Sequence, residues 1–150
     1  MPLNFALIGA SGYISPRHIL AIKNLKHNLK ISYDIKNDPS LLHNYFPKVN
    51  FFSKFEEFKK NFKRHKIDFT VIATPNHLHF KYIKYALKNG SNVICEKPLV
   101  TSINQFNQLE KLQIKYKKRA YTILQLRTLN EVKKLKKKID KSTKFYNVNI

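Results

Sequence analysis

Three short segments carry side chains that could bind a nucleotide or move a proton: a glycine turn from Gly9 to Ser15, a carboxylate at Asp34, and the Glu96–Lys97–Pro98 triplet. Backbone N–H groups at a glycine turn favour an anion such as a pyrophosphate. A carboxylate can accept hydrogen bonds from both hydroxyls of a ribose. A lysine held in a crevice can donate to a sugar hydroxyl or relay a proton.

The glycine turn reads "GASGYIS" and follows the first apolar run. Its Gly-x-x-Gly-x-x-Ser spacing departs from the G-x-G-x-x-G dinucleotide fingerprint, and alone it also fits an ordinary strand-to-helix connection. The small Ser15 is expected where the helix packs closely on the strand. The candidate cofactor-binding residues of this segment are Gly9, Ser11, Gly12, Tyr13 and Ile14.

Asp34 strengthens the dinucleotide interpretation because it follows Gly12 by 22 residues and ends a predicted strand. A carboxylate at this position binds the ribose of an adenosine. It would repel a 2′-phosphate, so it favours NAD over NADP, although Lys36 nearby weakens that preference. The alternative is an ordinary surface turn residue.

"ATPNHLH" ends another predicted strand, and Pro75 and Asn76 would form a turn at its carboxyl end. The Asn76 amide could bond a ribose or an amide of a dinucleotide. His77 and His79 suggest a metal site, but residues two apart do not share a helix face. With no third ligand evident, we expect no metal.

Glu96 and Lys97 end the next predicted strand, and Pro98 biases Lys97 towards an extended backbone. This would hold an ammonium group at the ligand crevice. Lys97 is therefore the candidate catalytic residue, and Glu96 a candidate cofactor contact. The alternative is a salt bridge on the surface.

The elements that must position these residues alternate between strands and helices, which predicts an α/β fold with a parallel sheet covered on both faces. Ligands of such sheets bind at the carboxyl ends of the strands. We expect four helix starts to be capped by side chains, at Ser15 with Pro16 following, at Asp38, at Ser53 with Glu56, and at Ser102 with Gln105. The predicted strands are 3–8, 30–34, 49–52, 68–73, 92–95, 120–126 and one starting at 144, and the predicted helices are 15–26, 38–46, 54–66, 75–87, 102–118 and 128–139.

The chain carries 29 basic and 9 acidic residues in 150, a formal net charge of +20. Lysine outnumbers arginine, which is typical of a solvated coat more than of a nucleic-acid surface, where arginine forks read phosphate and guanine. Nucleic-acid binding through the lysine-rich helix "EVKKLKKKIDK" nevertheless stays open as a second hypothesis. The single cysteine, Cys95, rules out an internal disulfide framework. With no long apolar run and no signal-peptide pattern, a cytoplasmic location and no membrane insertion are expected.

Together these residues resemble the glucose–fructose oxidoreductase and inositol dehydrogenase (Gfo/Idh/MocA) family. The resemblance covers nearly the whole chain and rests on the glycine turn, Asp34, "TPNHLH" and "EKPLV". More narrowly, "NFALIGASGYISPRHILAIK", "NVICEKPLV" and "ILQLR" look like the UDP-N-acetyl-2-amino-2-deoxyglucuronate dehydrogenases of lipopolysaccharide O-antigen synthesis. The resemblance implies a Rossmann-type doubly wound sheet, NAD as cofactor, and oxidation of a nucleotide sugar at C3.

The resemblance also assigns roles to residues. Lys97 matches the lysine that positions the reacting hydroxyl or relays its proton, and Glu96 lies beside the nicotinamide ribose. Arg127 matches an arginine that follows the sixth strand. The loop beside the nicotinamide half is matched by Thr74, Pro75, Asn76 and His79.

Members of this family continue into a second α/β domain that carries the sugar pocket. We therefore expect residues 1–127 to form the NAD-binding domain, and 128–150 a connecting helix and the first strand of a truncated second domain. The chain would bind NAD with little turnover alone, and a homo-oligomer or a complementing chain is a possible partner beside the nucleotide-sugar substrate. A decayed, inactive gene product is the third hypothesis.

Overall fold

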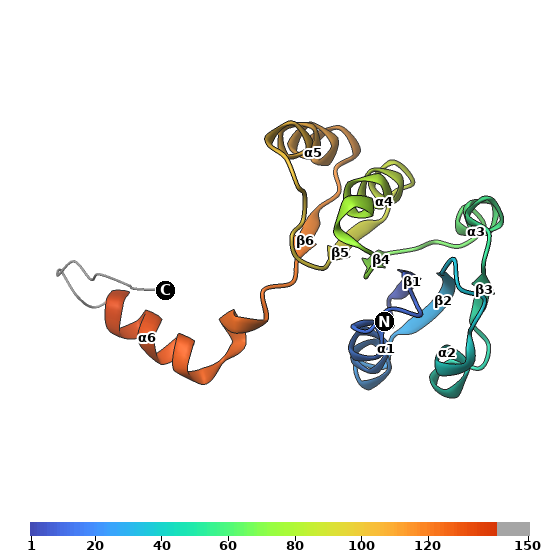
Figure 1. The fold of residues 1–150 in the computed structure, drawn as a ribbon, viewed down its shortest axis with the longest axis horizontal. Coiled ribbons are helices and arrows are strands. Elements are labelled where there is room, and N and C mark those ends of the chain that lie inside the picture. The colour runs from blue at the N-terminus through green and yellow to red at the C-terminus, as the bar shows by residue number, and fades with distance from the viewer. Residues whose placement is uncertain (141–150) are drawn as a thin grey trace.

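A computed structural model describes residues 1–140 (Figure 1). The predicted strand that starts at 144 lies outside the described residues. The elements are β1 (Asn4–Ile8), α1 (Ser15–Asn24), β2 (Asn28–Tyr33), α2 (Ser40–Tyr45), β3 (Asn50–Phe52), α3 (Phe55–Phe62), β4 (Phe69–Ile72), α4 (Asn76–Lys88), β5 (Asn92–Cys95), α5 (Ile103–Tyr116), β6 (Ala120–Thr122), the 3₁₀ helix η1 (Gln125–Thr128) and α6 (Asn130–Asp140).

The strands form one sheet of six in the order β3-β2-β1-β4-β5-β6, and every pair is parallel. The order runs outwards in both directions from β1 and β4, so the topological switch point lies between these two strands. A crevice at the carboxyl edge of such a sheet opens there. The Rossmann-type doubly wound fold predicted from the sequence is confirmed.

Apolar residues cover both faces of the sheet, because successive side chains of a strand point to opposite faces. On one face, Leu7 and Val71 pack with Ile19 of α1 and Leu42 of α2. On the other face, residues of β1, β4 and β5 pack against α3, α4 and α5, and the cluster there includes Phe58 and Phe62. Figure 1 shows the helices on either side of the sheet. The predicted core role of these two phenylalanines is confirmed.

Three of the four predicted helix caps are wrong. Ile14 is the N-cap of α1, so Ser15 and Pro16 lie one position deeper in the helix than expected. Pro39 and not Asp38 is the N-cap of α2, although the Asp38 carboxylate accepts a 3.0 Å bond from the Ser40 amide. The N-cap of α3 is Lys54, and neither Ser53 nor Glu56 makes a capping bond, because the helix begins one residue too late for that serine. The Ser102 cap is confirmed by a 3.2 Å bond from the Gln105 amide.

The sixth strand is shorter than predicted. Thr122 is its last residue, and the predicted segment up to Leu126 leaves the sheet. The physical reason is the neighbour: β5 ends at Cys95, which pairs with Thr122, so no strand continues the ladder beyond that register. Arg127 consequently lies in η1 and not at the sheet edge.

The last described helix, α6, extends away from the body of the sheet (Figure 1). Its residues are exposed. None of the helices among residues 1–140 combines the length and the apolar character that a bilayer crossing demands. In the same range, His, Cys, Asp and Glu side chains form no group of three suited to a metal ion.

Candidate functional site

A cavity of about 400 Å³, named the main cavity below, opens at the carboxyl ends of β1, β2 and β4. It therefore lies at the switch point that the strand order predicts. Its walls come from the glycine turn, from the residues after β2, and from the loop between β4 and α4. The lining residues are Gly9, Ser11, Gly12, Tyr33, Asp34, Ile35, Lys36, Ala73, Thr74, Pro75, His77, Leu78 and Tyr82.

The glycine turn packs directly against the end of β4. Gly9 has φ of +93°, and a Cβ added there would lie 2.6 Å from the carbonyl oxygen of Ala73. A Cβ on Gly12 would lie 3.1 Å from the same oxygen. At Gly9 only glycine allows this approach, and a side chain at Gly12 would have to push the end of β4 aside.

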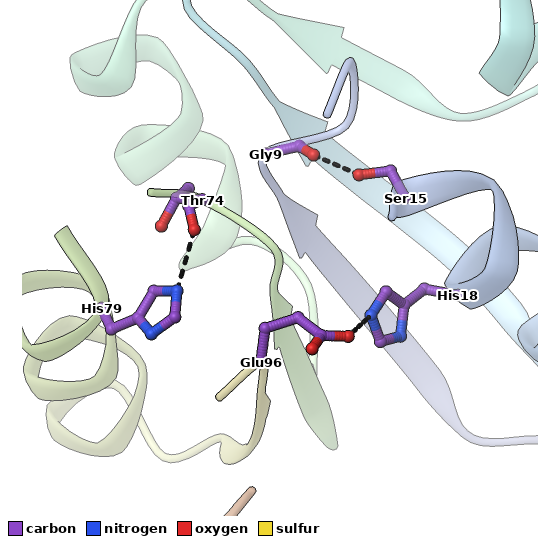
Figure 2. Close-up of polar contacts among 6 residues, drawn as sticks. All are labelled: Gly9, Ser15, His18, Thr74, His79 and Glu96. Atoms are coloured by element: carbon purple, nitrogen blue, oxygen red, sulfur yellow. Dashed lines mark hydrogen bonds and ion pairs between the residues drawn. The ribbon is translucent and has the colours of Figure 1, made fainter. Parts of the chain in front are cut away.

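Ser15 stabilises the turn, because its hydroxyl donates a hydrogen bond to the Gly9 carbonyl (Figure 2). Ser15 is fully buried, so the expected small residue at the helix–strand contact is observed. Within residues 1–140, the Tyr13 and Ile14 amides at the start of α1 find no acceptor. A helix N-terminus with free N–H groups binds anions, so these two amides fit a diphosphate.

Asp34 follows β2 and lines the cavity. Its Oδ2 accepts a 2.8 Å bond from the Ser11 amide, and its Oδ1 a 2.9 Å bond from the Lys36 amide. These bonds fix the carboxylate at one end of the cavity, as a ribose-binding residue requires. The Ser11 amide is therefore occupied by Asp34 and is not one of the free N–H groups.

Tyr33 and Tyr82 form the aromatic wall beside Asp34, with ring centroids 6.1 Å apart. Burial, the Tyr33 hydroxyl and the Asp34 carboxylate all raise the pKa of Tyr82 above its ordinary value. The phenol is therefore neutral at pH 7 and adds no charge to this end of the cavity. A neutral aromatic wall beside a carboxylate suits a nucleoside, whose base is flat and whose ribose carries hydroxyls.

The loop after β4 contributes Thr74, Pro75 and Asn76, of which Asn76 is exposed at the start of α4. The Thr74 hydroxyl is buried and has no partner among the described residues. His79 is fully buried, with Nδ1 2.7 Å from the Pro98 carbonyl and Nε2 2.8 Å from the Thr74 carbonyl. Any effect of His79 on a cofactor thus passes through the two loops that it joins.

Glu96 and Lys97 follow β5 at the same edge of the sheet. Glu96 is buried, and its Oε1 lies 2.9 Å from Nε2 of His18 on α1 (Figure 2). An ionised carboxylate only accepts, so Nε2 donates. Lys97 is exposed, and the Lys97–Pro98 peptide bond is cis.

The structure does not gather every predicted residue into the main cavity. Tyr13 is 92% exposed, and Ile14 packs into the apolar cluster below the turn. Arg127 is exposed in η1. The residues after β5 do not line the main cavity, and they lie at the same carboxyl edge beyond β4.

Two features at this edge were missed in the sequence. His18 gave no signal, because a histidine within an amphipathic helix is common and its partner Glu96 lies 78 residues away. Thr122 ends β6 with a buried hydroxyl that has no partner in the described part of the chain. No motif marks a lone threonine at the end of a strand.

Comparison with known proteins gives matches of the same architecture. The model of the GFO_IDH_MocA family, an oxidoreductase family with an NAD-binding Rossmann fold, matches residues 3–124. "Uncharacterized oxidoreductase YdgJ" from Escherichia coli is 39% identical over 54 residues, which are 36% of this chain and 16% of that protein.

Two solved structures are similar over most of the chain, both of the WlbA (WbpB) dehydrogenase from Thermus thermophilus, with 36% identity and a TM-score of 0.90. The structure in complex with NAD and alpha-ketoglutarate is matched over 95% of this chain and 48% of its own. The structure in complex with NAD and UDP-GlcNAcA is matched over 93% and 47%. This chain spans about half the length of these solved relatives.

Proposed function

Because the chain belongs to the Gfo/Idh/MocA oxidoreductase family, whose NAD-binding domain matches residues 3–124, we propose that it serves the oxidation of a sugar hydroxyl on a UDP-linked substrate. The observation that carries the cofactor part is the pairing of two free amides at the start of α1 with a fixed carboxylate at Asp34. The amides offer a positive site for a diphosphate next to the glycine turn, and Asp34 offers an acceptor for a ribose in the cavity that this turn lines.

NAD, when bound, accepts the hydride from the carbon that bears the reacting hydroxyl. The chain's own residues then have separate tasks. Tyr13 and Ile14 hold the diphosphate through their amides, and Asp34 holds the adenosine ribose. The Thr74 hydroxyl, which has no partner within residues 1–140, lies at the β4 edge, where the dinucleotide crosses the sheet. Lys97, whose exposed ammonium group stands at the end of β5, donates a hydrogen bond to the reacting hydroxyl, or relays its proton by passing one of its own to solvent.

The substrate proposal rests on the sugar held by a similar protein. UDP-GlcNAcA is bound in the Thermus thermophilus structure that is 36% identical to this chain. We assign the reaction to C3 of a UDP-N-acetylglucosaminuronate-like sugar in lipopolysaccharide O-antigen synthesis, as the sequence resemblance implies. Residues 1–127 form the cofactor-binding part in this proposal, and 128–150 lead towards the sugar-binding part, which a complementing chain or a second copy could also supply.

A thermal-shift titration of the 150-residue chain tests the cofactor part. NAD at about 100 times its Kd should stabilise the fold by about 2.7 kcal/mol and raise Tm by roughly 5–10 °C. NADP should raise it less, because Asp34 opposes a 2′-phosphate. Binding to a DNA or RNA oligonucleotide that falls steeply with salt, with no shift by NAD, would favour the nucleic-acid hypothesis instead.

A further inference from the structure

We propose that His18 positions the nicotinamide half of the cleft, acting through the Glu96 carboxylate and without touching the cofactor. This inference rests on the proposed NAD site. It concerns a residue that carries no recognisable motif and lies outside the main cavity. It explains why a buried acid is tolerated next to the exposed Lys97.

The geometry is that of a constrained hydrogen bond. The distance from Nε2 of His18 to Oε1 of Glu96 is 2.9 Å, and the two side chains are 12% and 11% exposed. A carboxylate this far from water needs a donor, and within residues 1–140 His18 is the donor that reaches it. The bond therefore fixes the rotamer of Glu96.

The two members of the pair come from elements on different sides of the cleft, so their bond links its two halves. His18 belongs to α1, whose first turn carries the free amides for a diphosphate. Glu96 follows β5, on the opposite side of the switch point from Asp34 and β2. A dinucleotide crosses a doubly wound sheet at that point, so Asp34 marks the adenosine half and Glu96 the nicotinamide half.

The consequence of removing His18 is local. Glu96 would be left as a buried carboxylate without a partner, and it would turn towards water or another donor. The backbone between Glu96 and Pro98 would follow, and with it the amine of Lys97. The Gly9–Gly12 turn and Asp34 would keep their own hydrogen bonds, which involve neither member of the pair.

Two ligands separate this role from a general structural role. ADP occupies only the adenosine and diphosphate half, whereas NAD occupies both halves. We would measure Kd for each ligand by isothermal titration calorimetry on the 150-residue chain. For His18→Ala we expect a roughly tenfold loss of NAD affinity, as for a lost hydrogen bond to a charged group, and a change in ADP affinity below about twofold.

Conservative variants sharpen the test. In His18→Gln, the side-chain amide can take the place of Nε2–H, so we expect most of the NAD affinity to return. The asparagine side chain of His18→Asn is too short to reach Glu96, so this variant should behave like His18→Ala. It replaces the alanine variant in the test if that variant does not fold. His43→Ala, at an exposed histidine of α2, is the matched control and should change neither Kd.

The outcomes are distinct. Equal losses for ADP and NAD would reduce His18 to a structural role, and an unchanged NAD affinity would remove any role; either result overturns the inference. Failure of the unmodified chain to bind either ligand would instead overturn the proposed function. Selective loss with alanine and asparagine, and recovery with glutamine, would support the inference.

Discussion

The amide of Ser11 donates a 2.8 Å hydrogen bond to the carboxylate of Asp34, across 23 residues of sequence. This bond joins the glycine turn after β1 to the end of β2. It aims one carboxylate oxygen at the turn, and the Lys36 amide holds the other. The acid is thereby oriented by the backbone before any ligand is present, which makes it a sensitive position for substitution.

We expect Asp34→Asn to weaken NAD binding by about ten- to a hundredfold, because a hydrogen bond to a charged acceptor is worth roughly 1.5–3 kcal/mol. NADP affinity should fall less, or rise, since the repulsion of a 2′-phosphate is removed. Isothermal titration with both cofactors measures the ratio. An unchanged NAD-to-NADP preference would show that Asp34 does not contact the ribose.

Gly12→Val should abolish NAD binding. The new Cβ would lie 3.1 Å from the Ala73 carbonyl oxygen and 3.3 Å from the Gly9 carbonyl oxygen, and the branched methyls would cover the amides at the start of α1. Fluorescence titration with NADH measures the loss, beside a thermal melt to verify folding.

The matched control is Gly90→Ala, at a glycine with φ of +82° and open space around it. It should cost about 1 kcal/mol of stability and leave NADH binding intact. Retained NADH binding in a folded Gly12→Val chain would contradict the assignment of the turn.

His79→Ala should destabilise the chain by about 3 kcal/mol, because it removes the ring that lies between the Thr74 and Pro98 carbonyls, with the N–H that one of them accepts, and opens a cavity in the core. Urea unfolding followed by circular dichroism measures the change. His77→Ala, two residues earlier and exposed, should cost less than about 0.5 kcal/mol. Similar costs for both variants would argue against the role of His79 as a clamp.

The free energy of unfolding should fall at alkaline pH because of the buried Cys95 thiol. Burial, with a smaller contribution from the Glu96 carboxylate, raises the pKa of its thiol from 9.0 to about 12. The folded state then keeps a proton that the unfolded state loses, so stability falls as pH rises from about 9 towards 12. Between these values the loss should reach ~1.4 kcal/mol per pH unit relative to Cys95→Ala. The free energy of unfolding of both proteins is measured by urea unfolding between pH 8 and 11. The same pH dependence in both proteins would contradict this prediction.

The 150-residue chain supplied with NAD and UDP-GlcNAcA should produce little NADH. Hydride transfer needs both reactants held with their reacting carbons close together. The main cavity among the described residues is suited to the dinucleotide. Absorbance at 340 nm follows the reaction, and robust oxidation by this chain would refute the division of tasks proposed for residues 1–127 and 128–150.

The sheet was predictable from the sequence because its signals are local. Phe5 to Ile8 is an apolar run followed by Gly9, and Asp34 follows the second strand at the distance of a dinucleotide site. The role of Ser15 was predicted only in part. Its burial follows from its small size, but its hydroxyl turns inwards to the Gly9 carbonyl instead of capping α1.

Contacts between distant segments could not be predicted. The bond between His18 and Glu96 depends on the placement of β4 and β5 beside β1, which no spacing in the sequence records. The early end of β6 at Thr122 has a similar cause, because the length of a strand is set by its neighbour as well as by its own residues. Propensity alone favoured a longer strand.

The contact between Gly9 and the Ala73 carbonyl bears on how tightly a cofactor would bind. The turn is braced by Ser15 below and by β4 beside it, so its shape is set in advance of binding. A preorganised seat of this kind loses little conformational entropy when a ligand arrives. The free energy of binding at the diphosphate should then depend mainly on the fit of the ligand, because little entropy is lost in ordering the turn.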